Sequence, residues 1–375
     1  MGLNRHARGD LQARSRRSPE PIVPCDARDD AFKNTTSHVD TWLSRTAWIA
    51  LSLLVWTAAC APRPRPTPTP PSPPAAPTLN LPRFVRVQVH AKGGASVVVL
   101  PLETYVTGVI LGEVSVPAAD RQFAATTYGV QAVLARTYAA ANLGRHLAAG
   151  FDLCDETHCQ VYRPPGPSQP EWRRSAANAA TIATTGRVLT FDGRPIQALY
   201  HAHCGGHTSA AAAVWGGAPV PYLGGVDDPY CLRQPSVWTS EIALDRLRVA
   251  LNASDRTRIG ARLTGIAVEA RDASGLTTRV RLEGDDTRTV RGEELRSSVA
   301  AALGASTLRS PKFTVVVRWG RAIFSGTGSG HGAGLCQTGA LERVRDGADL
   351  DSVLAAYYPG ATLTPLRRLP STTLP

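Results

Sequence analysis

A glutamate at the end of an apolar helical stripe is the first candidate for chemistry in this chain. Apolar residues precede Glu113 at intervals of three or four, which places them with it on one face of an α-helix. These residues are Leu102, Tyr105, Val106, Val109 and Ile110. A carboxyl at the end of a core-facing stripe is partly desolvated, which raises its pKa and suits a general acid. The alternative is a frayed helix end that points Glu113 into water.

A short segment carries side chains that suit a metal ion. Cys154, His158 and Cys159 lie within six residues, and thiolate and imidazole ligands favour Zn²⁺. His146 is the nearest candidate for a further ligand. The alternative, outside the cytosol, is a disulfide between Cys154 and Cys159 with His158 exposed.

A histidine-rich segment follows later in the chain. His201, His203 and His207 flank the sequence Cys204-Gly-Gly, and residues 201 and 203 would point the same way on a strand. Neither an acidic ligand nor the spacing of a metallohydrolase motif accompanies them. We therefore expect a polar lining of a cleft around a Gly-Gly turn.

Residues 326–339 are dense in glycine and offer His331 and Gln337 as polar groups. The segment lacks the Gly-Lys-Ser/Thr ending of a phosphate-binding loop. Glycine at this density lets a backbone approach a ligand closely. A plain glycine turn with a capping histidine is the alternative.

The number of cysteines constrains their pairing. Of seven, Cys25 and Cys60 lie in the N-terminal segment, and the remaining five cannot all pair. At least one of these five is therefore free or a metal ligand. We predict a disulfide between Cys204 and Cys231, which flank the glycine-rich middle segment.

The first residues read as targeting signals rather than as fold. Residues 48–59 form a short apolar run behind Arg45 and end in small residues before Cys60, which resembles a bacterial lipoprotein signal with Cys60 as the lipidated residue. A single anchor helix is the alternative. We predict a leader over 1–60, a proline-rich extended tether over 61–82, a folded domain over 83–366 and a tail over 367–375.

Composition and periodicity then define the class of the folded part. Apolar residues make up 43% of the 375 residues and charged residues 19%, as in globular proteins. The net charge of +11 favours anionic partners, but no spacing typical of nucleic-acid binding accompanies it, so we expect no nucleic-acid partner.

Strands are predicted over 84–89, 96–100, 264–270 and 278–282, and helices over 102–113, 122–143 and 350–357. From Val188 onward we expect mainly short strands and turns. Because strands and helices are segregated, the predicted class is α+β.

Together these segments resemble the SpoIID/LytB family. The matching stretches are 105–113, 131–138, 154–162, 200–208, 215–217, 221–223, 330–340 and 357–360. The resemblance spans about residues 84–365 and implies a strand-rich α+β domain with a few helices around a substrate cleft. The chain departs from the family pattern after Glu113, near Gly129, and at Cys204 and Cys336, where serine is frequent.

The resemblance implies a lytic transglycosylase that cleaves peptidoglycan between N-acetylmuramic acid and N-acetylglucosamine, with Glu113 as the single catalytic carboxyl. It also implies structural zinc at the segment 154–159. The side chains expected to bind the glycan are Arg136, Gln160, Tyr162, His201, His331 and Gln337. Arg136 could instead be a structural ion-pair partner, and Tyr162 a core residue.

The sequence is compatible with two other functions. The first is a non-catalytic module that binds glycan and activates a cell-wall amidase, and the second is a zinc amidase built on the histidine and cysteine segments. The expected partners are peptidoglycan strands, an amidase and, through a lipid on Cys60, a membrane. We expect an exported protein of the bacterial cell envelope.

Overall fold

The computed structural model describes residues 81–91 and 93–366. The predicted leader with Cys25 and Cys60, the tether up to residue 80 and the tail lie outside the described residues. The described part combines helices with several small sheets, which confirms the predicted α+β class. Within this part, no helix is both long and apolar enough to cross a membrane.

The chain begins with the predicted hairpin. Strand β1 (Phe84–Ala91) pairs antiparallel with β2 (Gly94–Pro101). The short strand β3 (Leu153–Cys154) joins the other edge of β1 in parallel, opposite Val87 and Gln88. The hairpin therefore holds the first of the predicted metal ligands in place.

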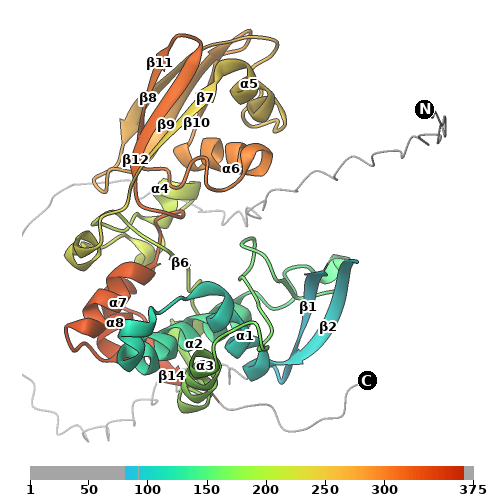
Figure 1. Ribbon diagram of the computed structural model, residues 1–375, viewed down its shortest axis with the longest axis vertical. Helices are drawn as coiled ribbons and strands as arrows, with labels where there is room; N and C mark the ends of the chain where they lie inside the picture. The colour runs from blue at the N-terminus through green and yellow to red at the C-terminus, as the bar shows by residue number, and fades with distance from the viewer. Residues whose placement is uncertain (1–80, 92, 367–375) are drawn as a thin grey trace, which may run out of the picture. The chain divides into compact units, whose positions relative to one another are not determined.

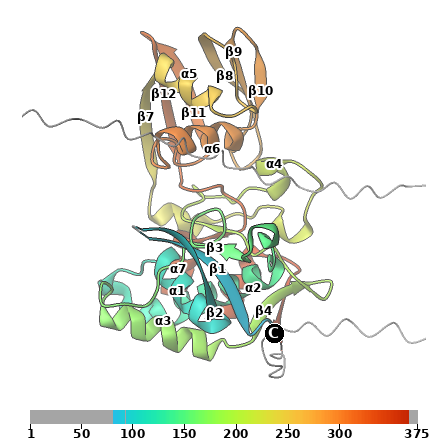
Figure 2. The same cartoon turned by 90° about the vertical axis from the view of Figure 1, so that its right-hand side faces the viewer.

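Three helices follow and pack on one another, and Figures 1 and 2 show them together. They are α1 (Leu102–Glu113), α2 (Ala124–Ala141) and α3 (Glu171–Ala183). A 3₁₀ helix, η1 (Ala118–Phe123), precedes α2, so the helix predicted over 122–143 begins with a tighter turn. Most of α2 is buried, because α1, α3 and β4 all pack against it.

The remaining strands of this first core form two small sheets. Strand β4 (Arg187–Phe191) lies between β5 (Arg194–Pro195) and β14 (Thr362–Pro365). Strand β6 (Tyr200–His201) pairs in parallel with β13 (Leu335–Cys336). This last pair brings the histidine-rich and glycine-rich segments together, although they lie far apart in the sequence.

Residues between these segments build a second hydrophobic core, which includes Trp238, Leu247, Val280, Leu295 and Phe324. Its sheets have the orders β10-β9-β8 and β11-β12-β7, and Figure 1 shows them with α5 and α6. The bounds are β7 (Val237–Ala243), α5 (Leu244–Asn252), β8 (Leu263–Arg271), β9 (Thr277–Gly284), β10 (Arg288–Val290), α6 (Gly292–Leu303), β11 (Phe313–Arg318) and β12 (Arg321–Thr327).

Helices after Val188 are more numerous than expected. Besides α5, α6 and the predicted α8 (Leu350–Tyr357), the chain forms α4 (Ala211–Trp215) and α7 (Gln337–Arg345). Short 3₁₀ turns are η2 (Leu147–Ala149), η3 (Pro221–Leu223) and η4 (Pro229–Arg233). Helix α7 was missed because it begins inside the glycine-rich segment, where Cys336 caps it by accepting from the Gly339 N–H.

Candidate active site

Helix α1 delivers Glu113 to a defined place at its C-terminal end. All five apolar residues of the predicted stripe are buried. Val114 is extended, with φ −116°, and ends the helix directly after Glu113. Oε1 of Glu113 accepts a hydrogen bond of 2.5 Å from the backbone N–H of Val161. The half-buried carboxyl is therefore bound to the protein, and the helix end is not frayed.

Two glycines of α1 make room for the segment that binds Glu113. A Cβ on Gly112 would overlap the carbonyl of Val161, and a Cβ on Gly108 would overlap the ring of Tyr162. Glycines one helical turn apart thus open one side of α1 to residues 160–162. The spacing of apolar residues in the sequence does not indicate this packing role.

A chain of hydrogen bonds ends at the Glu113 carboxyl. The Tyr105 hydroxyl donates to Gln160 Oε1 at 3.1 Å, and Gln160 Nε2 donates to the Tyr200 hydroxyl oxygen at 3.1 Å. The Tyr200 hydroxyl in turn donates to the Glu113 carboxyl. Because Tyr105 and Gln160 are fully buried, this chain fixes the orientation of both Tyr200 and Glu113.

Burial raises the pKa of Glu113 above its ordinary value. The Val161 N–H, the Tyr200 hydroxyl and the charge of Arg163 each lower this pKa, but burial has the larger effect. The direction is the one that the helical spacing predicted. A carboxyl of this kind retains its proton closer to neutral pH and can donate it to a bound molecule.

We predict that Tyr200→Phe raises the pKa of Glu113 further. The phenol donates a hydrogen bond to the charged carboxylate, so its loss disfavours ionisation. Carbon-13 NMR titration of the Glu113 carboxyl should show the midpoint at a higher pH than in the wild type. Tyr222→Phe is the matched control, because the hydroxyl of Tyr222 accepts from the Gln197 N–H instead. An unchanged or lower midpoint in Tyr200→Phe would contradict the prediction.

Gln337 lies beside Glu113, as expected of a site residue. Its Nε2 is 3.4 Å from the Glu113 backbone oxygen and 3.4 Å from Oε1 of Gln131. Nε2 of Gln131 is buried and has no hydrogen-bond partner. An unpaired buried donor is costly, and Gln337 connects this amide to the backbone of the candidate acid.

His201 and His331 also come together. Their ring centroids are 5.6 Å apart, and the Trp215 ring lies 5.0 Å from that of His331. Nδ1 of His201 donates to the Ala333 carbonyl at 3.1 Å, which leaves its Nε2 buried without a partner. Trp215 is 44% exposed, so an aromatic face beside these imidazoles is open to solvent.

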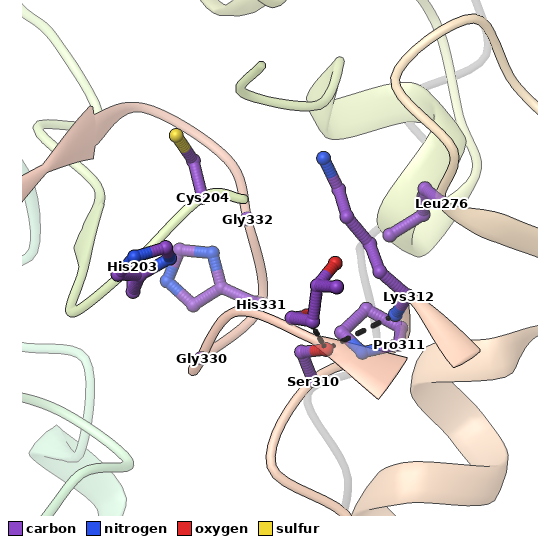
Figure 3. Close-up of a pocket in the computed structure, with 10 residues that line it drawn as sticks. His203, Cys204, Leu276, Ser310, Pro311, Lys312, Gly330, His331 and Gly332 are labelled. Carbon is purple, nitrogen blue, oxygen red and sulfur yellow. Dashed lines mark hydrogen bonds between the residues drawn. The ribbon is translucent and has the colours of Figure 1, made fainter. Parts of the chain in front are cut away.

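His203 is held by two backbone hydrogen bonds of its own. Its Nε2 donates to the Gln234 carbonyl at 2.6 Å, and its Nδ1 accepts from the Gly205 N–H at 3.1 Å. Figure 3 shows His203 and His331 on one side of a narrow pocket and Lys312 and Leu276 on the other. Strand β6 ends at His201, and His203 forms an isolated bridge with Ser329, so the shared direction of residues 201 and 203 stays a prediction.

Burial makes both imidazoles of the His201–His331 pair neutral at physiological pH. Desolvation lowers the pKa of His201 to about 3, and the neighbouring His331 lowers it further in the same direction. Desolvation likewise lowers the pKa of His331 to about 3. Neutral imidazoles can each donate one hydrogen bond and accept one.

We predict that His331→Asn makes folding less sensitive to acid. An unfolded histidine takes up a proton below about pH 6.5, whereas folded His331 stays neutral down to about pH 3. As the pH falls from about 6.5 towards about 3, His331 therefore lowers the free energy of unfolding by about 1.4 kcal/mol per pH unit. Urea unfolding between pH 7 and pH 4 should show a shallower loss in the variant. His90→Gln is the control, because its hydrogen bond to Asp155 raises the pKa of His90, and it should not make the loss shallower.

Arg136 is a predicted substrate ligand that the structure places in the core. Its side chain is completely buried. Nη2 donates to Oε2 of Glu103 at 2.6 Å, Nε donates to Oε1 at 3.2 Å, and Nη1 donates to the Arg187 carbonyl at 3.1 Å. The structure contradicts the expected contact between Arg136 and the glycan. Arg136 is instead a structural ion-pair partner of Glu103.

Tyr162 and Gln160 are likewise inside the protein. The ring of Tyr162 stacks on Tyr105 with centroids 5.8 Å apart, and its side chain is buried. Gln160 is fully buried and acts on Glu113 through Tyr200. Both residues position the site rather than line its surface, which corrects the expectation that they touch substrate.

The predicted zinc ligands come together. One donor atom from each of His146, Cys154, His158 and Cys159 lies within 4.8 Å of the others, and Nε2 of His146 is 3.3 Å from Sγ of Cys159. We call these four residues the first cluster. Both cysteines are free, so the structure lacks the alternative disulfide. The hydrogen bond from Cys159 lowers the pKa of Cys154 to about 4.

Cys204 and Cys231 are free thiols rather than the expected disulfide. Parallel pairing of β6 with β13 brings Cys336 next to Cys204, whose N–H donates to Sγ of Cys336 at 3.2 Å. Pairing by position in the sequence overlooked this third sulfur.

Comparison with known proteins identifies the family. Residues 91–191 match the family model described as stage II sporulation protein. An uncharacterized protein of Brachyspira hyodysenteriae is 30% identical over 276 residues, which cover 72% of this chain and 68% of that protein. This chain belongs to the SpoIID/LytB family.

Two named relatives are also similar to this SpoIID/LytB-family chain. The stage II sporulation protein D of Bacillus amyloliquefaciens is 28% identical over 75% of this chain and 79% of that protein. An amidase enhancer of Bacillus subtilis is 29% identical over 62% of this chain and 37% of that protein. The segment matched by the family model includes Glu113 and the first cluster, whereas His201 and His331 lie beyond it.

Sequence reasoning missed three site residues. Val161 contributes only its backbone N–H, which no side-chain pattern reveals. Tyr200 directly precedes His201 but reads as an ordinary strand residue. Trp215 stands before two glycines, and a tryptophan next to a glycine turn was the available signal.

Proposed function

We propose that this chain is a peptidoglycan lytic transglycosylase with Glu113 as its only acid–base carboxyl. The observation that carries the proposal is the half-buried Glu113, whose pKa is raised by burial and which is held by the Val161 N–H and the Tyr200 hydroxyl. In the described part of the chain, the groups that shift its pKa are Val161, Tyr200 and Arg163, none of which is a carboxylate. Ordinary glycosidases use a pair of carboxyls.

A single carboxyl suffices when the substrate supplies its own nucleophile. Protonated Glu113 donates its proton to the glycosidic oxygen as the bond from C1 of N-acetylmuramic acid to that oxygen breaks. The Glu113 carboxylate then accepts the proton of the C6 hydroxyl, whose oxygen bonds to C1. The products are a 1,6-anhydro ring and a free N-acetylglucosamine end, and no water is consumed.

Polar and aromatic side chains of the histidine-rich and glycine-rich segments are suited to bind a sugar. His201 and His331 are neutral, so each imidazole can donate one hydrogen bond to a hydroxyl or acetamido group of the sugar and accept another. The half-exposed Trp215 offers an aromatic face to a pyranose ring. Gln337 supplies an amide group beside the backbone of Glu113, and Gln131 accepts a hydrogen bond from it.

A second candidate function is a glycan-binding activator of a cell-wall amidase. The similarity to an amidase enhancer favours it. Such a module needs the same polar surface but no ionisable Glu113. A cell-wall role is common to both candidates.

Digestion of purified sacculi separates the two candidates. Mass spectrometry of the soluble products should detect anhydro-muropeptides if the chain is a transglycosylase. Absence of sugar products, with faster peptide release when an amidase is added, would support the activator instead. Release of peptides alone, sensitive to a chelator, would indicate a zinc amidase.

We propose structural zinc at the first cluster. Two thiolates and two imidazoles fit a tetrahedral Zn²⁺. A bound metal ion would cross-link the loop at His146 to Cys159. Cys159 directly precedes Gln160 and Val161 in the chain. The ion would thereby fix the backbone that binds Glu113. Metal analysis of the wild type and Cys159→Ser tests this, and equal zinc in both would contradict it.

We also propose that the protein is exported and carries a lipid on Cys60, because an apolar run and small residues precede this cysteine. Palmitate labelling of wild type and Cys60→Ala tests the anchor. Label on the wild type only is expected, and an unlabelled wild type would refute lipidation.

A further inference from the structure

Three cysteines and an aspartate converge in the first hydrophobic core. One donor atom from each of Cys204, Asp228, Cys231 and Cys336 lies within 4.8 Å of the others, and all four residues are buried. We call them the second cluster. In a tetrahedral zinc site with Zn–S bonds of about 2.3 Å, the ligand atoms are about 3.8 Å apart. The second cluster is therefore close to the size of a metal site.

The backbone around the second cluster is arranged for charged sulfur. The Cys204 N–H donates to Sγ of Cys336 at 3.2 Å, and the Gly339 N–H donates to the same sulfur at 3.4 Å. The Gly206 N–H donates to Sγ of Cys204 at 3.4 Å. A neutral thiol is a weak acceptor, whereas a thiolate gains from such donors. Thiolate is also the form of cysteine that binds metals.

Asp228 supplies an oxygen that lacks a hydrogen bond. The side chain is completely buried, its Oδ2 accepts from the Tyr357 hydroxyl at 2.8 Å, and its Oδ1 has no hydrogen-bond partner. Only glycine fits at position 339, because a Cβ there would overlap Oδ2 of Asp228. The fold thus brings a carboxylate against three sulfurs, at a cost that a bound cation would offset.

His203 is a neighbour of the second cluster rather than a ligand. Its ring lies 3.3 Å from Sγ of Cys231, but its two nitrogens are already bonded to Gly205 and Gln234. Asp228 is therefore the better fourth ligand.

Cationic side chains surround the second cluster. Nη2 of Arg343 lies 3.7 Å from Oδ1 of Asp228. The side chain of Lys312 is buried and shares a pocket with Cys204 (Figure 3). Three thiolates and a carboxylate around a divalent ion carry net negative charge, which these two cations reduce.

We propose that the second cluster binds one Zn²⁺ ion. Three thiolates and one carboxylate are ligands that this ion accepts. The ion would join the loop after β6, which holds Cys204, to η4 and to the end of β13. It would so connect the segment that follows Tyr200 with the start of α7 at Gln337. A disulfide could join only two of the three sulfurs and would leave the third beside the buried Asp228 carboxylate. This proposal does not depend on the reaction at Glu113.

Metal counting on the purified chain tests the proposal. Plasma mass spectrometry should find about one zinc ion fewer per chain in Cys231→Ser than in the wild type. Cys154→Ser/Cys159→Ser is the matched control, because it removes only ligands of the first cluster and should retain the ion of the second. X-ray absorption on that double variant should show three sulfur ligands around zinc.

A measurement on the wild type covers the case in which Cys231→Ser fails to fold. Alkylation followed by peptide mass spectrometry should find Cys204, Cys231 and Cys336 protected until a chelator removes zinc, and reactive afterwards. Equal zinc in the wild type and a folded Cys231→Ser would overturn the proposal. So would a Cys204–Cys231 disulfide in the isolated protein, or alkylation that chelation leaves unchanged.

Discussion

Glu113→Gln should abolish glycan cleavage while leaving the protein folded. General acid–base catalysis by one side chain contributes about 10²- to 10⁴-fold to a rate, and a single carboxyl here is proposed to serve as both acid and base. Glutamine keeps the Oε1 that accepts from the Val161 N–H, so packing at the end of α1 should survive. Release of anhydro-muropeptides from sacculi, followed over time, measures the loss.

Stability of the same variant provides an independent readout. Because burial raises the folded pKa of Glu113 above the ordinary value of 4.5, the unfolded carboxyl loses its proton at a lower pH than the folded one. The wild type therefore loses stability as the pH rises through the interval between these two pKa values, and the loss persists above it. Glu113→Gln has no proton to lose there, so at pH 7 it should melt no lower than the wild type.

Glu171→Gln is the matched control for activity. This glutamate lies in the first turn of α3, and its side chain is exposed. Its substitution should change neither cleavage nor melting. If Glu113→Gln cleaves as fast as Glu171→Gln, Glu113 has no part in the chemistry. If Glu113→Gln is inactive only because it unfolds, the melting experiment reveals it.

Arg136→Met should lower the free energy of unfolding strongly, because Arg136 stabilises the core. Removing one partner of a buried ion pair costs about 3–5 kcal/mol, because the remaining group loses its compensation. The Arg136 guanidinium also satisfies backbone carbonyls, including that of Arg187, which would then lack these hydrogen bonds. Urea unfolding monitored by circular dichroism measures the difference.

A double-mutant cycle separates the two roles considered for Arg136. Glu103→Gln alone should also be destabilising, and the combination with Arg136→Met should cost less than the sum of the single changes. Arg233→Met removes an exposed pair with Asp346 and should change stability little. Wild-type stability in Arg136→Met, together with lost glycan binding, would restore Arg136 as a substrate ligand.

The parts of the site that sequence predicted are those with local causes. The apolar spacing of α1 depends on neighbours three and four residues apart, and it correctly indicated a partly buried Glu113. The first cluster was also accessible, because three of its members lie within six residues and His146 is close in the chain. The hairpin β1–β2 and helix α8 follow from short-range periodicity as well.

The parts that sequence missed depend on contacts across the fold. The sequence left Arg136 either as a glycan ligand or as a structural ion-pair partner, and only the packing of α1 against α2 supplied Glu103 as its partner. The Cys204–Cys231 disulfide was predicted from the positions of the two cysteines in the sequence. The pairing of β6 with β13 brings a third cysteine, Cys336, next to them.

By itself, the sequence determined the α+β class, the family and the position of the candidate acid, because residue periodicity and motif order do not require knowledge of distant contacts. Only the tertiary structure decided what surrounds that acid. The Val161 N–H and the Tyr200 hydroxyl reach Glu113 because glycines in α1 admit the segment 160–162. Hydrogen bonds, burial and shared sulfur neighbours depend on which surfaces meet, and these surfaces come from segments far apart in the chain.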